Sequence, residues 1–371
     1  MRRVGKTTLL KYFFEKINSK NKIFLDLEDP LNRSLFDQKK TYGLIKTALE
    51  RMGINFSQKA YLFLDEIQFC PSIPSVVKYF YDHYQIKFFL TGSASFYLKN
   101  LFSESLAGRK YLFELYPLDF EEFLQFKGLS YRLPRFEETV DEQTYNLFFP
   151  QVEEYFFWGG MPEVTLQDNP AEKQMALRDI FSSYFQKEVQ TLGDFRKNEV
   201  VKNLIQLLTK RVGQKVDIQR VASELKVSRQ AVYEYLGFLS GTYFLCLVPA
   251  LGQADTQVRK QRKVYFVDTG FFSFLETPPS GAVFENAVFA NLRLLGEIYY
   301  FQKNKKEVDF ILKTQKKEKI AFEVKETVIT SDLNVLKRRV EKLGIKKAFI
   351  ISLKFSGLKE VKYLFQLSGS F

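Results

Sequence analysis

The feature that most restricts the fold of this chain is an apolar run that ends in two adjacent carboxylates. Residues 60–66 read Ala-Tyr-Leu-Phe-Leu-Asp-Glu, so Asp65 and Glu66 follow an uninterrupted apolar stretch. A stretch of this kind is typical of a strand buried on both faces, as in a parallel sheet covered by helices. Much earlier, a Gly-Lys-Thr-Thr sequence at residues 5–8 opens an apolar-periodic helix expected to continue through Lys16. Together the two segments predict an α/β domain with a parallel sheet.

Residues 5–8 form the second half of a phosphate-binding loop, G-x-x-x-x-G-K-[ST]. In such a loop the backbone N–H groups surround the phosphates, the lysine reaches the terminal phosphates and the hydroxyl holds Mg²⁺. The first glycine of the pattern would fall before Met1. We therefore expect ATP to be bound by Arg3, Val4, Gly5, Lys6, Thr7 and Thr8, with Thr7 on Mg²⁺.

The paired carboxylates complete this expectation. Asp65 would hold the Mg²⁺ ion, and Glu66 would polarise the attacking water as the catalytic residue. A further apolar run at 86–91 ends in hydroxyl residues, among which Ser93 could sense the γ-phosphate. With another strand at 22–27 and helices between, these runs predict ordered strand–helix units. The alternative is that the two acidic residues merely end a strand.

Four segments between Met1 and about Leu124 together resemble the AAA-like ATPases of archaea and bacteria, a branch of the P-loop class. They are R-R-V-G-K-T-T-L-L, F-L-D-E-I-Q, L-T-G-S-A-S and S-L-A-G-R-K-Y-L-F-E-L-Y-P-L-D-F-E-E-F-L. The resemblance implies ATP hydrolysis, Ser93 as a first sensor and Arg109 as an arginine finger or subunit contact, and hence a homo-oligomer. Members of this family carry a strand and G-x-R-R before V-G-K-T, so the resemblance implies a P-loop NTPase sheet truncated at its N-terminal side.

The length of the chain predicts several domains. We expect an AAA-like P-loop ATPase domain at 1–125, a helical lid or linker at 126–196, a winged helix-turn-helix at 197–252 and an α/β domain at 253–371.

The third of these segments has the pattern of a winged helix. Helices are expected at 197–211 and 218–225, and Ser228 would cap a third helix, with a strand-like run at 243–248 as the wing. Such a third helix contacts the DNA major groove through its N-terminal residues. The candidate nucleic-acid contacts are Arg229, Gln230 and Tyr233. The alternative is a lid or docking module that binds no DNA.

The C-terminal segment holds a second acidic group. Strands are expected at 307–312 and 320–325, and a hairpin symmetric about Lys316 would place Asp309 opposite Glu323. Carboxylates that converge on half-buried strands are costly unless they bind something, typically a metal ion. The expected Mg²⁺ ligands are Asp309, Glu323 and, from a helix starting at Gly281, Glu285. Lys325 would orient or deprotonate the attacking water, as in metal-assisted phosphodiester hydrolysis.

The same residues look like the D…E-x-K signature of restriction-endonuclease-like, PD-(D/E)xK domains. F-E-N-x-V, E-V-D-F and F-E-V-K also resemble the C-terminal domain of unknown function 4143 that commonly follows these ATPases, over roughly 170–330. The resemblance implies that Asp309, Glu323 and Lys325 are catalytic. The alternatives are a ladder of ion pairs on an edge strand, and a nuclease-shaped domain without activity.

Composition restricts the partners. The net charge of +12 favours an anionic partner, DNA first. Only Cys70, Cys246 and one histidine, His83, are present, which argues against disulfide scaffolds and against cysteine- or histidine-bound metals. The sequence contains no long uncharged apolar stretch and no secretory signal, so we expect a cytoplasmic protein without a membrane partner. The leading hypothesis is an ATP-dependent nucleic-acid-processing protein, and the alternative is a nucleotide-regulated DNA- or protein-binding switch without nuclease activity.

Overall fold

The chain forms two compact units, each with its own sheet. The structure, a computed structural model, describes residues 2–37, 39–93, 110–192, 198–252, 261–275, 278–303 and 306–367. The first unit comprises residues 1–115 and 241–243, and the second comprises 116–240 and 244–371. Both units are of the mixed α/β type.

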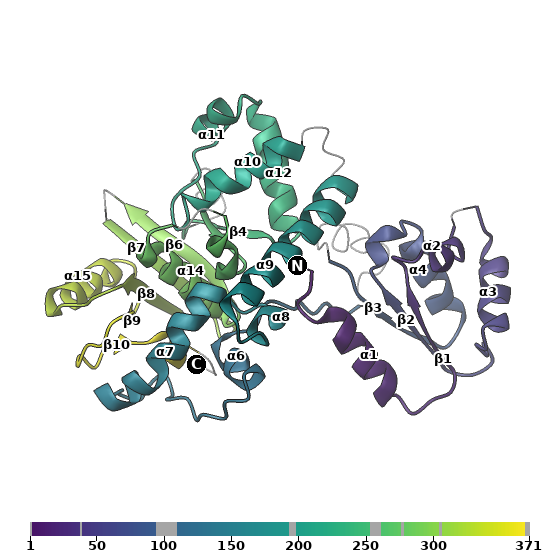
Figure 1. The fold of residues 1–371 in the computed structure, drawn as a ribbon, viewed down its shortest axis with the longest axis horizontal. Helices are drawn as coiled ribbons and strands as arrows, with labels where there is room; N and C mark the ends of the chain where they lie inside the picture. Colours follow the sequence, from purple (N-terminus) through teal and green to yellow (C-terminus); the bar gives the residue numbers. More distant parts are fainter. Residues whose placement is uncertain are drawn as a thin grey trace. The chain divides into compact units, whose positions relative to one another are not determined.

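The described part of the first unit contains a parallel sheet of three strands in the order β1-β2-β3 (Figure 1). The strands are β1 (Lys22–Asp26), β2 (Ala60–Asp65) and β3 (Ile86–Leu90), which confirms the three expected strands. The main helices are α1 (Lys6–Lys16), α2 (Pro30–Ser34), α3 (Tyr42–Arg51) and α4 (Ile73–His83). Because β1 pairs with β2 with Asp26 beside Asp65, the carboxyl ends of these strands lie at one edge.

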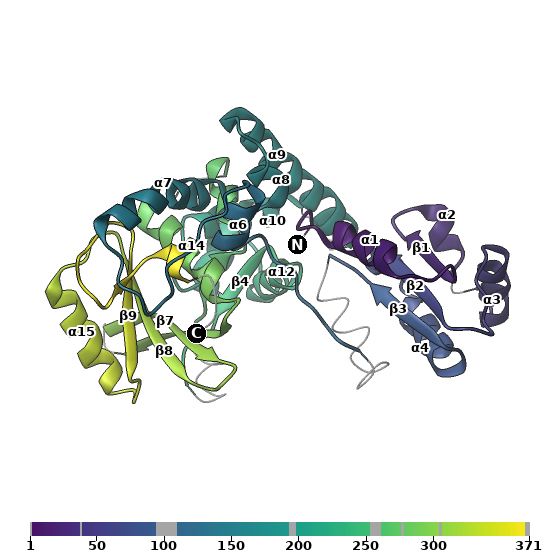
Figure 2. The ribbon, with the colours of Figure 1, turned by 90° about the horizontal axis from the view of Figure 1, so that it is seen from below.

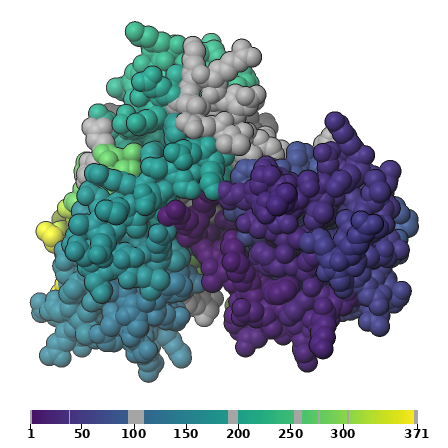
Figure 3. Space-filling model, turned by 45° about the vertical axis from the view of Figure 1, so that its right-hand side comes forward, coloured from purple at the N-terminus to yellow at the C-terminus, as the bar shows by residue number. Residues whose placement is uncertain are grey.

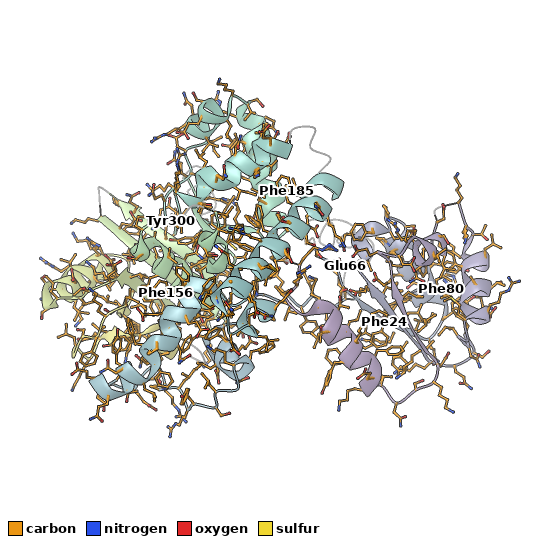
Figure 4. The ribbon with its side chains drawn as sticks, viewed as in Figure 1. Phe24, Glu66, Phe80, Phe156, Phe185 and Tyr300 are labelled. Atoms are coloured by element: carbon orange, nitrogen blue, oxygen red, sulfur yellow. The ribbon has the colours of Figure 1, made fainter. Side chains whose placement is uncertain are left out.

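Helices cover both faces of this sheet (Figure 2). On one face, the ring of Phe14 in α1 packs edge-on against Phe24 of β1 and Phe63 of β2. On the other face, α3 and α4 enclose an apolar core that includes Leu62 and Phe80, which is labelled in Figure 4. The buried run predicted from the sequence is therefore the middle strand β2, which is covered on both faces.

Helix α1 is anchored to the sheet by few side chains. Leu10 is its buried residue, whereas Leu9, Tyr12 and Phe13 are exposed to 45%, 53% and 43%. Much of α1, in purple, accordingly lies on the surface in the space-filling view (Figure 3). The position of α1 therefore depends on Leu10 and on the contacts of Phe14.

The second unit is built on a sheet of five strands in the order β10-β9-β8-β7-β6. Strand β7 (Lys306–Thr314) runs antiparallel to both of its neighbours, β6 (Gly296–Lys303) and β8 (Lys319–Lys325). Strand β9 (Lys347–Ser352) runs parallel to β8 and to β10 (Val361–Lys362). Helix α14 (Ser280–Leu292) contacts β8, and α15 (Thr330–Glu341) contacts β7 and β9.

Four helices precede this sheet in the chain: α6 (Phe120–Phe126), α7 (Glu142–Trp158), α8 (Pro162–Thr165) and α9 (Pro170–Tyr184). They form the helical segment that the sequence predicts. Next come α10 (Asn198–Thr209), α11 (Ile218–Leu225), α12 (Arg229–Gly241) and the antiparallel pair of β4 (Leu245–Val248) and β5 (Lys263–Phe266). The three helices and the strand expected between 197 and 248 are thus present.

A double-glycine loop fastens the helical segment to the rest of the second unit. Helix α7 ends at Gly159, which has a φ of 79°, and the N–H of Gly160 donates to Oδ2 of buried Asp268 at 2.8 Å. The other carboxylate oxygen accepts from the N–H of Gly270 at 2.8 Å. A Cβ on Gly160 would lie 2.1 Å from the carbonyl oxygen of Leu118, so this position has no room for a side chain.

The substitution Gly160→Ala is expected to destabilise the second unit by roughly 2 kcal/mol or more, because the new Cβ would push the loop off Leu118 and weaken the bond to Asp268. Denaturant unfolding followed by far-UV circular dichroism measures this. Gly237→Ala in α12 is the matched control, since a Cβ there meets nothing within 4 Å and should stabilise the helix by up to ~1 kcal/mol. Equal effects of the two substitutions would contradict the assigned role of Gly160.

Asp268 should also make the stability of the second unit depend on pH. Burial raises its pKa from the ordinary 3.8 to about 6, although the N–H groups of Gly160 and Gly270 and nearby Arg293 oppose the rise. Since the folded-state pKa is the higher one, its contribution to the free energy of unfolding is complete below 3.8 and is lost as the pH rises through about 6. The loss amounts to at most ~3 kcal/mol. We expect Asp268→Asn to be less stable than the parent protein below pH 3.8, with a deficit that shrinks as the pH rises to about 6 and then stays constant in unfolding titrations; a deficit that is equal at low and at neutral pH would contradict this.

Candidate functional site

The phosphate loop ends where α1 begins. Gly5 precedes the helix with a φ of 95°, a left-handed conformation that favours glycine, and Lys6 is the first helical residue. The N–H groups of the first helical turn therefore point out of the helix end, where the dipole favours an anion. Val4 is buried beneath this turn, whereas Arg3 and Thr8 are exposed.

The structure brings Thr7 and Asp65 into direct contact, as the sequence predicts for the two motifs. The hydroxyl of Thr7 donates to Oδ2 of Asp65 at 2.7 Å. Asp65 is only 2% exposed, and its other oxygen accepts from the hydroxyl of Thr91 at the end of β3. A hydroxyl and a carboxylate are thus held side by side at the carboxyl edge of the sheet.

Glu66 lies directly beyond the end of β2, where it is labelled in Figure 4. Its carboxylate accepts from the Ser93 hydroxyl at 2.9 and 3.2 Å and from the side-chain amide of Gln68. The guanidinium of Arg2 lies 3.7 Å away. Burial alone would raise the pKa of Glu66, but Lys6, Arg2 and the two hydrogen bonds together lower the pKa below its ordinary value. Glu66 is therefore a carboxylate at neutral pH.

Sequence reasoning missed two members of this site, Arg2 and Gln68, whereas Thr91 is one of the hydroxyl residues expected at the end of the 86–91 run. Buried Arg2 pairs with Glu28 at 3.1 Å in addition to facing Glu66, so it links the ends of two strands. The sequence did contain a signal for these residues, because each lies within two residues of a recognised motif. The expected arginine finger, Arg109, lies outside the described residues.

The donor set fits a magnesium-bound nucleoside triphosphate. The hydroxyl of Thr7 and the carboxylate of Asp65 are hard oxygen ligands of the type that Mg²⁺ prefers. Lys6 and the N–H groups at the start of α1 suit phosphate oxygens. Thr7 and Asp65 would hold the metal, and the residues from Gly5 to Thr8 would hold the phosphates.

The C-terminal carboxylates come together as the predicted register requires. Strand β7 pairs with β8 from Phe310 beside Phe322 to Lys313 beside Lys319, a register that is symmetric about Lys316. Asp309 and Glu323 are the next residues beyond this paired stretch, and the charge of Asp309 acts on Glu323. Oδ2 of Asp309 accepts from the N–H of Val324 at 2.8 Å. The hairpin geometry that the sequence predicts is therefore confirmed.

Cations of the chain itself pair with these carboxylates. Glu323 accepts from Arg339 of α15 at 3.1 Å, and Nζ of Lys325 donates to Asp332 of the same helix at 2.8 Å. Burial raises the pKa of Glu323 to about 7, and Asp309 adds to the rise, while Arg339 and Lys325 oppose it. The hydrogen-bond partner of Lys325 is thus Asp332, which the E-x-K spacing does not reveal, although its charge also acts on Glu323.

The expected third carboxylate, Glu285, contacts a different set of residues. It accepts from the Tyr265 hydroxyl at 2.6 Å and lies 3.7 Å from Nζ of Lys263, which is also 3.7 Å from Asp309. Burial and nearby Asp309 raise the pKa of Glu285 to about 7, against Lys263 and Tyr265. In the part of the chain that the structure describes, no group of three or more His, Cys, Asp or Glu residues is arranged to hold a metal ion.

Lys263 is the last residue of a basic run at 259–263, whose sequence indicates either a segment that contacts phosphates or solvated loop charge. Lys263 contradicts both interpretations, because it is 3% exposed and points into the carboxylates from β5. Lysine side chains usually lie at the surface, but a lysine can be buried where acidic side chains pair with its charge. Arg259 and Lys260 lie outside the described residues.

The helix-turn-helix candidates lie on the surface of the second unit. The Ser228 hydroxyl accepts from the N–H of Ala231 at 3.1 Å, so it caps α12 as expected. Arg229, Gln230 and Tyr233 in the first turns of α12 are exposed, and Tyr233 keeps 60% of its surface accessible. These three side chains are therefore available to a ligand. A search of the described residues for a helix long and apolar enough to cross a membrane finds none.

Three stretches of the chain match protein families. Residues 1–124 match a family described as an AAA domain. Residues 150–280 match domain of unknown function 8612, and residues 280–364 match domain of unknown function 4143.

The chain is also similar to individual proteins over most of its length. Uncharacterized protein MJ1544 of Methanocaldococcus jannaschii is 27% identical over 364 residues, which cover 93% of this chain and 78% of that protein. An uncharacterized protein of Haemophilus influenzae is 25% identical over 381 residues, covering 97% and 91%. Among solved structures, the Walker-type ATPase paby2304 of Pyrococcus abyssi aligns with a TM-score of 0.42 and 14% identity over 74% of this chain and 89% of that chain. The family matches therefore place a resemblance to an AAA domain in the N-terminal third of the chain and a resemblance to domain of unknown function 4143 near its C-terminal end.

Proposed function

We propose that the first unit binds ATP with Mg²⁺ and hydrolyses it. The contact between Thr7 and Asp65 carries this proposal, because it joins the phosphate loop to the carboxyl edge of the sheet. The match of residues 1–124 to an AAA domain supports it. Bound Mg²⁺ would neutralise charge on the β- and γ-phosphates and thereby favour phosphoryl transfer to water.

Each residue of the site has a role that its surroundings favour. Lys6, at the start of α1, would bind the terminal phosphates together with the helix N–H groups. Glu66 is held ionised beside Ser93, so it can accept a hydrogen bond from the attacking water and orient it. Ser93 lies between Glu66 and the end of β3, where it could report the presence of the γ-phosphate.

Lys6→Ala should weaken ATP binding at least tenfold, because the charge at the phosphate end of α1 is lost. Glu66→Gln should still bind ATP but lower the hydrolysis rate on the order of 100-fold, because an amide is a poor base. Binding is measured by calorimetry with Mg²⁺ and a non-hydrolysable ATP analogue, and hydrolysis by phosphate release.

Lys16→Ala is the matched control for Lys6→Ala, since it removes the same charge from the exposed last turn of α1, roughly 15 Å along the helix. It should leave binding and hydrolysis unchanged. The ATPase proposal fails if Lys6→Ala binds the analogue as tightly as the unchanged protein.

We propose further that the second unit binds DNA through α12. Three exposed side chains, Arg229, Gln230 and Tyr233, lie at the capped start of this helix, which is where a groove-binding helix places its reading residues. The net charge of +12 favours this partner. ATP binding in the first unit would then regulate how the second unit engages DNA.

Cleavage of the bound DNA is the second candidate function of this unit. The convergence of Asp309 and Glu323 on β7 and β8 favours it, since paired carboxylates of this kind can bind Mg²⁺ for phosphodiester hydrolysis. Their ion pairs with cations of the chain favour the alternative, a DNA- or protein-binding switch that does not cut. Plasmid nicking with Mg²⁺ or Mn²⁺ that Asp309→Ala abolishes and Lys6→Ala spares would decide for the nuclease.

Arg229→Ala combined with Tyr233→Ala should weaken binding of duplex DNA about tenfold or more, because a phosphate or base contact and a stacking surface are lost. Fluorescence anisotropy at several salt concentrations measures this. Lys202→Ala, an exposed charge on α10, is the control and should have little effect. Affinity that is independent of salt and of both sets of substitutions would contradict DNA binding through α12.

A further inference from the structure

Lys263 lies at the centre of three carboxylates contributed by other elements of the second unit. Its Nζ is 2.5 Å from Oε1 of Glu307 and 3.7 Å from both Oε1 of Glu285 and Oδ1 of Asp309. Glu285 belongs to α14, and Glu307 and Asp309 belong to β7. The cation itself comes from β5, the strand that follows the helices α10 to α12. We call these four residues the Lys263 cluster.

The surroundings keep the Lys263 side chain in this position. The ring of Tyr300, labelled in Figure 4, has its centre 5.8 Å from Nζ. The Tyr265 hydroxyl fixes Glu285 at 2.6 Å, and Gly213 packs so closely that a Cβ there would lie 3.0 Å from Glu285. Burial alone lowers the pKa of Lys263, but the three carboxylates more than reverse this effect, so the side chain is an ammonium ion at neutral pH.

Three carboxylates at this spacing require a cation. Without one, their mutual repulsion and their loss of hydration would oppose folding. Carboxylates are the ligands that Mg²⁺ and Mn²⁺ prefer, but as they stand in the described structure these three are not arranged to hold such an ion. Here an ammonium group that is covalently part of the chain occupies the place between them. An ion from solution therefore competes with Lys263 for its ligands.

We propose that Lys263 is a built-in cation that closes the Glu285–Glu307–Asp309 cluster to divalent metal ions. The proposal itself concerns metal binding. Only its consequence, that the closed cluster would prevent metal-dependent DNA cleavage, rests on the proposed nuclease function.

The test is Mn²⁺ binding by the full-length protein without nucleotide, followed by electron paramagnetic resonance of the free ion. All variants carry Asp65→Asn, which removes the metal ligand of the ATP site. The parent should bind Mn²⁺ weakly, and Lys263→Met should gain one site at least tenfold tighter. Lys263→Arg keeps the positive charge and should remain closed. Adding both Glu285→Gln and Asp309→Asn to Lys263→Met leaves a single carboxylate and should abolish the gain.

A second variant guards against loss of folding. Lys263→Met with Glu307→Gln removes one charge of each sign, which leaves the net charge of the cluster unchanged. It should fold, as judged by circular dichroism, and its melting temperature should rise with Mn²⁺ more than that of the parent. The proposal is overturned if this folded variant gains no Mn²⁺ affinity, or if the parent already binds one Mn²⁺ ion as tightly as Lys263→Met.

The same proteins separate this proposal from nuclease function. If Lys263→Met binds Mn²⁺ but nicks no plasmid, the built-in cation stands and the nuclease proposal fails. If the parent nicks plasmid with Mn²⁺ at the rate of Lys263→Met, the lysine does not close the site and the proposal is overturned, while the nuclease proposal stands.

Discussion

The hydrogen bond between Thr7 and Asp65 is the contact on which the nucleotide site depends. It joins the first turn of α1 to the last residue of β2, and no local force brings these segments together. The packing of Phe14 against Phe24 and Phe63 holds α1 on the sheet and so sets this distance. The apolar core therefore positions the groups proposed to act on the nucleotide, and Glu66 follows because it is the next residue of the chain after Asp65.

The second unit is organised by buried charges that compensate each other. Lys263 faces three carboxylates, Arg339 pairs with Glu323, and Lys325 pairs with Asp332. Buried ion pairs of this kind contribute little net stability but are costly to break singly, so they determine which groups can respond to a ligand. The carboxylates on β7 and β8 are thus both a candidate metal site and part of an internal network of ion pairs.

The sequence predicted the elements that local patterns determine. The strands around 22–26, 60–65 and 86–90, the helices at 218–225 and from Arg229, and the β7–β8 register all follow from apolar periodicity, capping residues and turn symmetry. The partners of the charged residues did not follow from such patterns. Nothing in the sequence indicated that Arg2 and Lys263 are buried beside carboxylates, since a basic residue has the same sequence signature whether it is solvated or buried against acids.

The sequence by itself determined that Lys6 and Thr7 precede a helix and that Asp65 and Glu66 end a buried strand, because both depend on residues adjacent in the chain. It also determined that Asp309 and Glu323 oppose each other across a hairpin, because a short symmetric turn leaves one register. Only the tertiary structure decided that Lys263 fills the space between Glu285, Glu307 and Asp309. That contact joins β5, α14 and β7, and its geometry arises from packing between elements rather than from any pattern within one of them.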